Sequence, residues 1–126
     1  MEDYKSAALR HLSDAETLRD GGRFDNAGHL VGFAAECAIK FKISTLTTDG
    51  AAPHGHLPDF LVVARKHLGA RTRYSGMYNI VKRDIFKSWD VGRRYETTGA
   101  TVEQELDEWF SETRRLFAQA QIKERK

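Results

Sequence analysis

Residues 23 to 43, RFDNAGHLVGFAAECAIKFKI, limit what this chain can fold into more than any other stretch. At about 100° per residue, the period of a helix, apolar side chains cover most of its circumference. A helix that is apolar nearly all round belongs inside a bundle, because a surface helix keeps a broad polar face. We therefore predict a central helix over 23–43 with other helices packed around it. Its apolar residues are Ala27, Leu30, Val31, Phe33, Ala34, Ala35, Cys37, Ala38, Ile39 and Phe41.

A narrow polar stripe interrupts this helix. Glu36 and Lys40 are four residues apart, the spacing at which a carboxylate and an ammonium group pair on a helix. Burying both groups is costly unless they are paired or partly hydrated. The stripe is therefore a structural ion pair, a thin solvent-facing edge or the wall of a binding site. Its members, with Gly32 in the gap between them, are Asp25, His29, Glu36 and Lys40.

The composition is that of one soluble domain covering 1–126. Of 126 residues, 40% are hydrophobic and 30% are charged, and two prolines favour a helical protein. No apolar run reaches the ~20 residues that a membrane span needs, and MEDYKSAALRH lacks the apolar region of a secretory signal. The single Cys37 lies among apolar residues, which argues against disulfides and cysteine-based metal sites. We expect a cytoplasmic protein without membrane contact.

Four more helices are predicted around the central one. The first covers 3–19, and the short turn Gly21-Gly22 makes it antiparallel to 23–43. The others cover 58–68, 75–89 and the residues from Thr101 on, where Thr101 to Gln104 has the pattern of a capping box. The predicted fold class is therefore all-α, an up-and-down four-helix bundle with an additional helix. The apolar stripe expected on the last helix is Val102, Leu106, Trp109, Phe110, Thr113, Leu116, Phe117 and Ala120.

The net charge is only +2, but the charges are unevenly spread. Residues 96–112 contain six acidic side chains and no lysine or arginine, whereas 65–95 contain nine lysines or arginines and only two acidic residues. This asymmetry favours a surface for polyanions or complementary self-association, although it also fits an ordinary charged helix surface. The basic residues are Arg65, Lys66, Arg71, Arg73, Lys82, Arg83, Lys87, Arg93 and Arg94, and the acidic ones are Glu96, Glu103, Glu105, Asp107, Glu108 and Glu112.

Sequence motifs for common chemistries are missing. The chain has no phosphate-binding glycine loop, no nucleophile elbow and no HExxH motif. His54 and His56 are too few for a zinc site, so we predict neither a metal nor a cofactor. Metal-independent RNA cleavage needs less, because one histidine and nearby cations suffice. The candidates by residue type are Arg23, His29, Lys40, His54, His56, Arg93 and Arg94.

Several short motifs, taken in order, resemble the HEPN domain family. They are GRFDNAGHLVGFAAECAIKFKI at 22–43, HGHLPDF at 54–60, and then a tryptophan followed by Arg94-Tyr95. The similarity spans roughly 5–120. Each motif is short, and it is their order and spacing that carry the resemblance. The residues that match are Gly22, Arg23, Ala27, Ala35, Glu36, Lys40, His56, Leu57, Arg94 and Tyr95.

The resemblance implies a dimeric helical bundle that acts in toxin–antitoxin systems, antiviral defence or RNA processing, often beside a minimal nucleotidyltransferase. Catalytic members carry an R-x4-6-H motif late in the fold, and here no histidine follows Arg83 or Arg94 at that distance. The one R-x5-H runs from Arg23 to His29, at the start of the central helix. The resemblance therefore implies the non-catalytic, binding type.

We therefore predict a homodimeric module that binds RNA, a nucleotide or a nucleotidyltransferase partner. In such a module Glu36 and Lys40 would line a polar pocket near Arg94 and Tyr95, with Arg93 beside them. The alternative is a metal-independent endoribonuclease toxin with a displaced site, for which the candidate catalytic residues are His29, Arg23 and His56.

Overall fold

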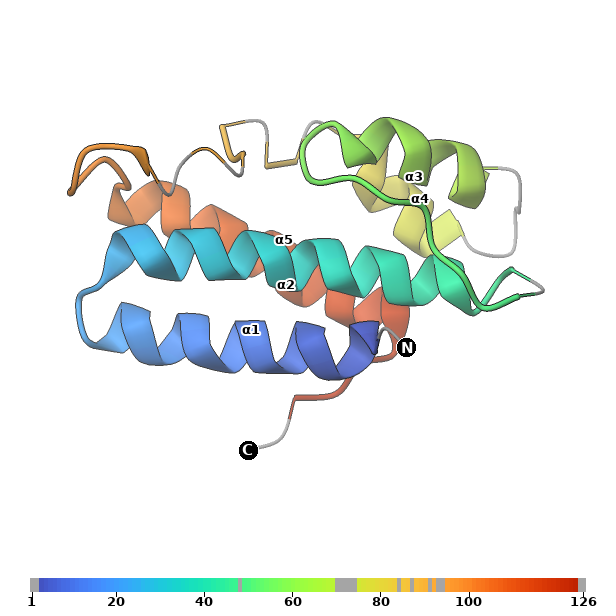
Figure 1. The fold of residues 1–126 in the computed structure, drawn as a ribbon, viewed down its shortest axis with the longest axis horizontal. Helices are drawn as coiled ribbons and strands as arrows, with labels where there is room; N and C mark the ends of the chain where they lie inside the picture. Colours follow the sequence, from blue (N-terminus) through green and yellow to red (C-terminus); the bar gives the residue numbers. More distant parts are fainter. Residues whose placement is uncertain are drawn as a thin grey trace.

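Helices make up all the regular secondary structure in the described part of the computed structural model (Figure 1). The structure describes residues 3–47, 49–69, 75–83, 85–86, 88–90, 92 and 95–124. The predicted all-α bundle is confirmed, and no helix found there is both long and apolar enough to cross a bilayer. The helices are α1 (Tyr4–Asp20), α2 (Phe24–Ser44), α3 (Phe60–Gly69), α4 (Ser75–Val81) and α5 (Glu103–Ala120).

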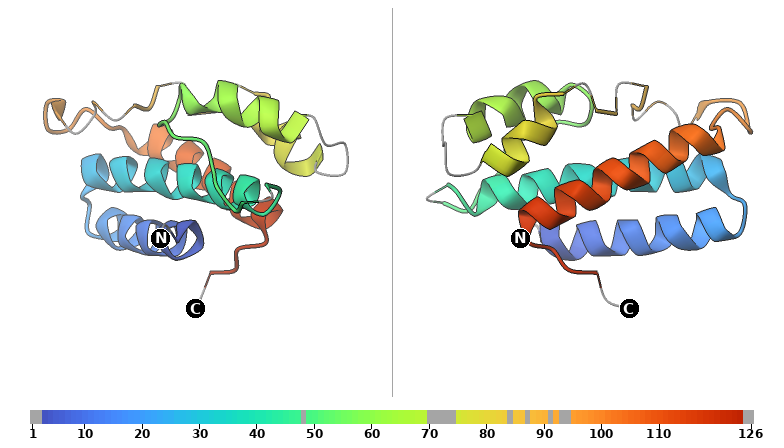
Figure 2. Two further views of the ribbon diagram at one scale, coloured as in Figure 1. Left: turned by 45° about the vertical axis from the view of Figure 1, so that its right-hand side comes forward. Right: turned by 180° about the vertical axis from the view of Figure 1, so that it is seen from behind.

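The predicted central position of the second helix is confirmed. Helix α2 packs against α1 on one side and α5 on the other, and the hairpin α3–α4 covers the half that leads to Ser44 (Figures 1 and 2). Contacts on several sides explain why α2 lacks a broad polar face. Its fully buried hydrophobic residues are Ala27, Val31, Ala34, Ala35, Ala38, Ile39 and Ile43.

The gap in the polar stripe of α2 is filled by Trp89. Gly32 has no side chain, and a Cβ built on it would lie 2.0 Å from Cε2 of Trp89. The indole N–H donates to the carbonyl of Gly28 at 2.7 Å, and the ring is fully buried. The missing side chain of Gly32 thus forms a notch that receives the indole, whereas a Cβ built on Gly28 would lie 2.9 Å from Cζ3 of a different ring, that of Trp109.

Helix α4 is shorter than predicted. The sequence predicted it over 75–89, but it ends at Val81, and Trp89 reaches the core from the turns that follow. Arg65 of α3 binds the end of α4, because its Nε donates to the carbonyl of Val81 at 2.6 Å and its Nη2 to that of Arg83 at 3.0 Å. These bonds satisfy carbonyls that a helix end leaves without intrahelical donors.

The predicted capping box before α5 is wrong. Helix α5 starts at Glu103 after Val102, and no side chain caps it. The backbone N–H of Thr101 instead donates to Oδ1 of Asp25, and that of Gly99 donates to Oδ2, at 3.1 and 2.7 Å. A carboxylate on α2 therefore holds the segment before α5 in place. The predicted stripe of α5 is buried except for Val102, which is 58% exposed.

Candidate functional site around Glu36

Glu36 and Lys40 form an ion pair inside the bundle. Lys40 Nζ lies 3.2 Å from Glu36 Oε2, and the two side chains are only 10% and 5% exposed. Of the three interpretations left open by the sequence, the thin solvent-facing edge does not fit this burial. The structure shows that Glu36 and Lys40 are both paired and buried.

The same two side chains hold the loop that leads to α3. The backbone N–H of Leu57 donates to Glu36 Oε1 at 3.0 Å, and Lys40 Nζ donates to the carbonyl of Gly55 at 2.8 Å. Gly55 has φ of +124°, a conformation that side chains rarely allow. Both buried charges thus gain hydrogen bonds beyond their own pair, which offsets part of their desolvation. We call Glu36, Lys40 and His56 the clasp.

His56 is the exposed member of the clasp. Its Nδ1 lies 3.2 Å from both carboxylate oxygens of Glu36, and its side chain is 57% exposed. A carboxylate at this distance requires a proton on Nδ1. In the neutral ring, Nε2 is then a proton acceptor. Carboxylate and imidazole stand in the same relation in enzymes that use histidine as a base.

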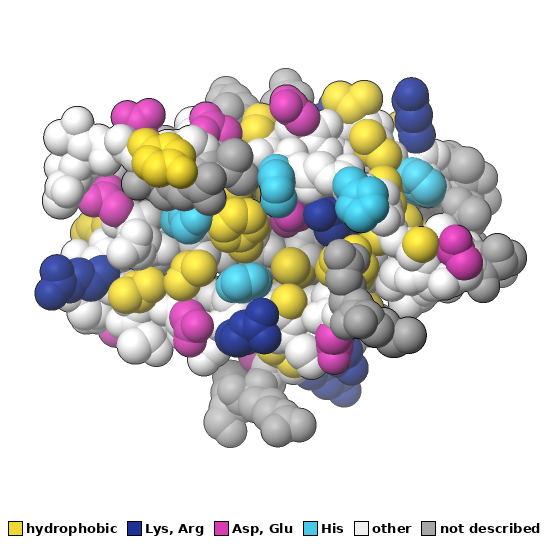
Figure 3. All heavy atoms as spheres, in the orientation of Figure 1, with side chains coloured by type: hydrophobic (Ala, Val, Ile, Leu, Met, Phe, Trp, Pro, Cys, Tyr) yellow, Lys and Arg dark blue, Asp and Glu magenta, His cyan; other side chains and the backbone are white. Residues whose placement is uncertain are grey.

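Histidines from three parts of the chain surround the half-buried ring of Phe33. The ring centroids of His11, His29 and His56 lie 5.9, 4.7 and 5.9 Å from that of Phe33. His29 also stacks on Trp89, with centroids 6.1 Å apart. Figure 3 shows histidine side chains gathered with hydrophobic ones across this face of the molecule.

The environment of His11 changes its titration. Burial lowers the pKa of His11, and the neighbouring Arg10 guanidinium lowers it further, against the opposite effects of Asp14 and Glu36. His11 lies on α1 and is partly buried where this helix packs on α2. Its position beside Phe33 depends on how α1 packs on α2, which no local pattern specifies.

Arg23 and His29, the pair with R-x5-H spacing, have different surroundings. Arg23 precedes α2 and lines a hollow of about 290 Å³ with residues 22–26, Glu96 and Thr98. His29 packs on aromatic rings further along the helix. Tyr95 is 79% exposed. Its neighbour in the chain, Glu96, lies beside the first residues of α2, and that end of the helix is about 15 Å from Glu36 along the helix axis. Arg93 and Arg94 lie outside the described residues.

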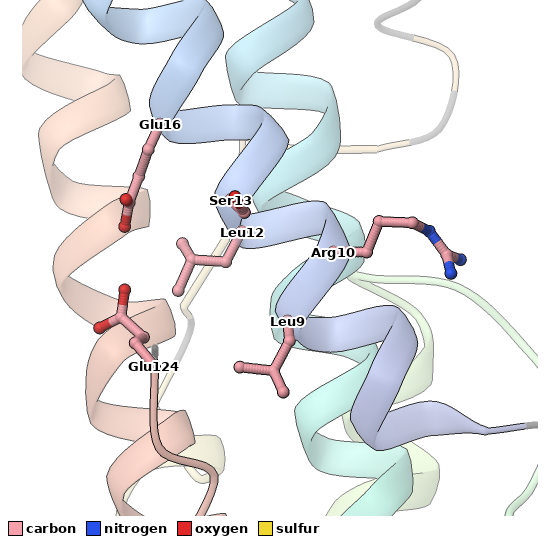
Figure 4. A pocket seen from close by; sticks show the side chains of 6 residues that line it. All are labelled: Leu9, Arg10, Leu12, Ser13, Glu16 and Glu124. Atoms are coloured by element: carbon pink, nitrogen blue, oxygen red, sulfur yellow. The ribbon is translucent and has the colours of Figure 1, made fainter. Parts of the chain in front are cut away.

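A second hollow, of about 280 Å³, lies between α1 and the segment after α5 (Figure 4). The residues of α1 that line it are Leu9, Arg10, Leu12, Ser13 and Glu16. Arg114 pairs with both carboxylates there, Glu16 and Glu124, so these charges are largely neutralised.

No group of three or more potential metal ligands is found among the described residues. Comparisons of the chain with models of protein families, with curated proteins and with solved structures find no match.

Proposed function

We propose that this chain is a binding module of the HEPN type that binds RNA without cleaving it. The supporting observation is the surface of the hairpin α3–α4. Lys66, Lys82 and Arg83 are exposed there, and Arg65 is turned inward onto the carbonyls that end α4. Several exposed cations on one surface can contact several phosphates at once, which is how proteins gain most of their affinity for nucleic acid.

The resemblance to the HEPN family adds two partners to this proposal. The module would form a homodimer, and it would act beside a minimal nucleotidyltransferase. Glu36 and Lys40 have a structural part in it, since they fix the loop that begins the hairpin. In this proposal the exposed cations of the hairpin α3–α4 make the contacts with phosphate.

A salt titration of RNA binding tests the proposal. With a single-stranded RNA of about 20 nucleotides, the logarithm of the affinity should fall linearly with the logarithm of the salt concentration, and Lys66→Gln with Lys82→Gln should reduce the slope by about 1.4. A matched control removes two exposed lysines elsewhere, Lys5→Gln with Lys123→Gln. The proposal fails if wild type does not bind at low salt, or if both double variants weaken binding equally.

The clasp favours a second candidate function, a metal-independent endoribonuclease. The side chain of His56 is 57% exposed and its ring is oriented by Glu36, so its Nε2 can take the proton of a ribose 2′-hydroxyl. The hydroxyl oxygen would then attack the adjacent phosphorus, and a 2′,3′-cyclic phosphate would form as the bond from phosphorus to the 5′-oxygen breaks. The 5′-oxygen would take a proton from water, and His56 would release its proton to water.

One substitution separates this activity from stability. His56→Asn keeps an N–H near the position of Nδ1 for Glu36 but removes Nε2. Cleavage in EDTA should then drop by about 10²–10⁴-fold, while the protein still folds. His54→Asn, two residues away and exposed, is the control. Intact RNA at high concentrations of wild-type protein would eliminate this candidate.

A further inference from the structure

Two surfaces of opposite charge lie toward opposite ends of α2. The first, the basic hairpin, consists of Val62 and Lys66 on α3 and of Lys82 and Arg83 directly after α4. The second, the acidic end, consists of Val102, Glu103, Asp107 and Glu108, where α5 begins. All of these residues are exposed, and none takes part in an ion pair between described residues.

Contacts with α2 fix the separation of the two surfaces. The segment before the acidic end is bound to Asp25 through the N–H of Thr101. Helix α3, which carries Val62 and Lys66 of the basic hairpin, starts at Phe60, and the ring of Phe60 lies 5.2 Å from Lys40 Nζ. Asp25 and Lys40 are 15 residues apart on one helix, which is about 22 Å. The two surfaces therefore cannot pair within one molecule. The ribbon views show α3–α4 and the start of α5 toward opposite ends of α2 (Figures 1 and 2).

Each surface also carries an exposed valine. Val62 is 56% exposed and lies one helical turn before Lys66, and Val102 is 58% exposed and adjoins Glu103. An apolar side chain beside charges of one sign is suited to a partner with an apolar side chain beside charges of the other sign. The chain itself supplies both halves of this match.

We infer that the acidic end of one molecule docks on the basic hairpin of a second copy. The contact is head-to-tail, so it joins different surfaces of the two copies and leaves one of each free for further copies. It goes beyond the proposed function. The contact uses the same cations that are proposed to bind RNA, so the acidic end and RNA compete for the basic hairpin.

A charge swap tests this contact by sedimentation velocity at low and high salt, without RNA. Wild type should form larger species as its concentration rises at low salt, and lose them at high salt. Asp107→Lys with Glu108→Lys should weaken self-association at least tenfold, and so should Lys66→Glu with Lys82→Glu. A mixture of the two double variants should associate again, because each then carries the complement of the other. Asp14→Lys with Asp20→Lys, on exposed positions of α1, makes the same charge change elsewhere and should have little effect.

Three results would overturn the inference: wild type that stays monomeric at low salt and high concentration, association that neither charge reversal weakens, or a mixture that does not associate. The second result would point to a two-fold dimer through other faces. Failure of RNA binding is a separate outcome. A chain that binds no RNA but passes the charge swap disproves the proposed function alone, and the Asp107→Lys, Glu108→Lys variant should still bind RNA if that function is correct.

Discussion

At the scale of single residues, Glu36 connects the interior of the bundle to the loop that covers it. Its carboxylate accepts from the N–H of Leu57, from Lys40 and from His56. Helical spacing put Glu36 and Lys40 at pairing distance, and the sequence left a structural ion pair as one of three interpretations. It did not predict the bonds to residues 55–57, because a loop that returns to a helix 20 residues later leaves no periodic pattern.

Glu36→Ala should lower the free energy of unfolding by about 3 kcal/mol or more, because it leaves Lys40 buried without its counter-charge. Urea unfolding measures the loss. Asp14→Ala, which removes an exposed carboxylate on α1, is the control and should change stability by less than about 0.5 kcal/mol. A loss below about 1 kcal/mol for Glu36→Ala would mean that the pair behaves like a surface salt bridge.

His11 should make stability depend on pH. Burial holds the pKa of His11 below 6.5, its value in an unfolded chain. As pH falls through 6.5, the unfolded chain takes up the proton first, so the folded state loses stability until the pH passes below the folded pKa. Above that window His11 makes no difference.

Urea unfolding at pH 7.5 and 5.5 checks this sign. The loss between the two values should be smaller in His11→Gln than in wild type, by less than about 1 kcal/mol because the ring is only half-buried. The exposed His54 provides the control variant, His54→Gln. An equal or larger loss in His11→Gln would contradict the assignment.

At the scale of helices, α2 and α5 followed their sequence patterns and α4 did not. Val81, Ile85 and Trp89 are spaced four residues apart and are all buried, but only Val81 lies in a helix. Phe86 adopts φ of +55°, which no helix contains, and this turn brings Trp89 to α2. The spacing of apolar residues indicates which of them are buried, but it does not show whether a helix or a turn buries them. Gly32, the gap in the polar stripe, is where the Trp89 ring packs.

The notch in α2 leads to a prediction about Gly32. Gly32→Ala should destabilise the fold by at least about 2 kcal/mol, because the new Cβ would lie 2.0 Å from a buried indole that cannot move aside. Gly21→Ala is the matched control, since its Cβ would have its nearest neighbour at 3.6 Å. Thermal unfolding followed by near-UV circular dichroism compares them. Equal stability of the two variants would show that Trp89 does not occupy the notch.

At the scale of the whole molecule, the bundle is organised by the burial of α2. The fold class followed from the sequence because an apolar helix of this length needs neighbours on several sides. The arrangement of residues in the candidate site did not follow from the sequence in the same way. Glu36 and Lys40 were identified by spacing, whereas the grouping of His11, His29 and His56 around Phe33 depends on how α1 and the loop before α3 pack on α2.

Backbone hydrogen exchange, followed by NMR for each amide, tests most directly that α2 is the interior helix and that Glu36 fastens the loop to it. The amides of residues 31–39 should exchange only through global unfolding, with free energies equal to that from urea unfolding. The N–H of Leu57 should be protected in wild type and lose protection in Glu36→Ala before α2 does. Exchange of α2 that is faster than that of α1 and α5 would contradict the account, because it would place α2 at the periphery.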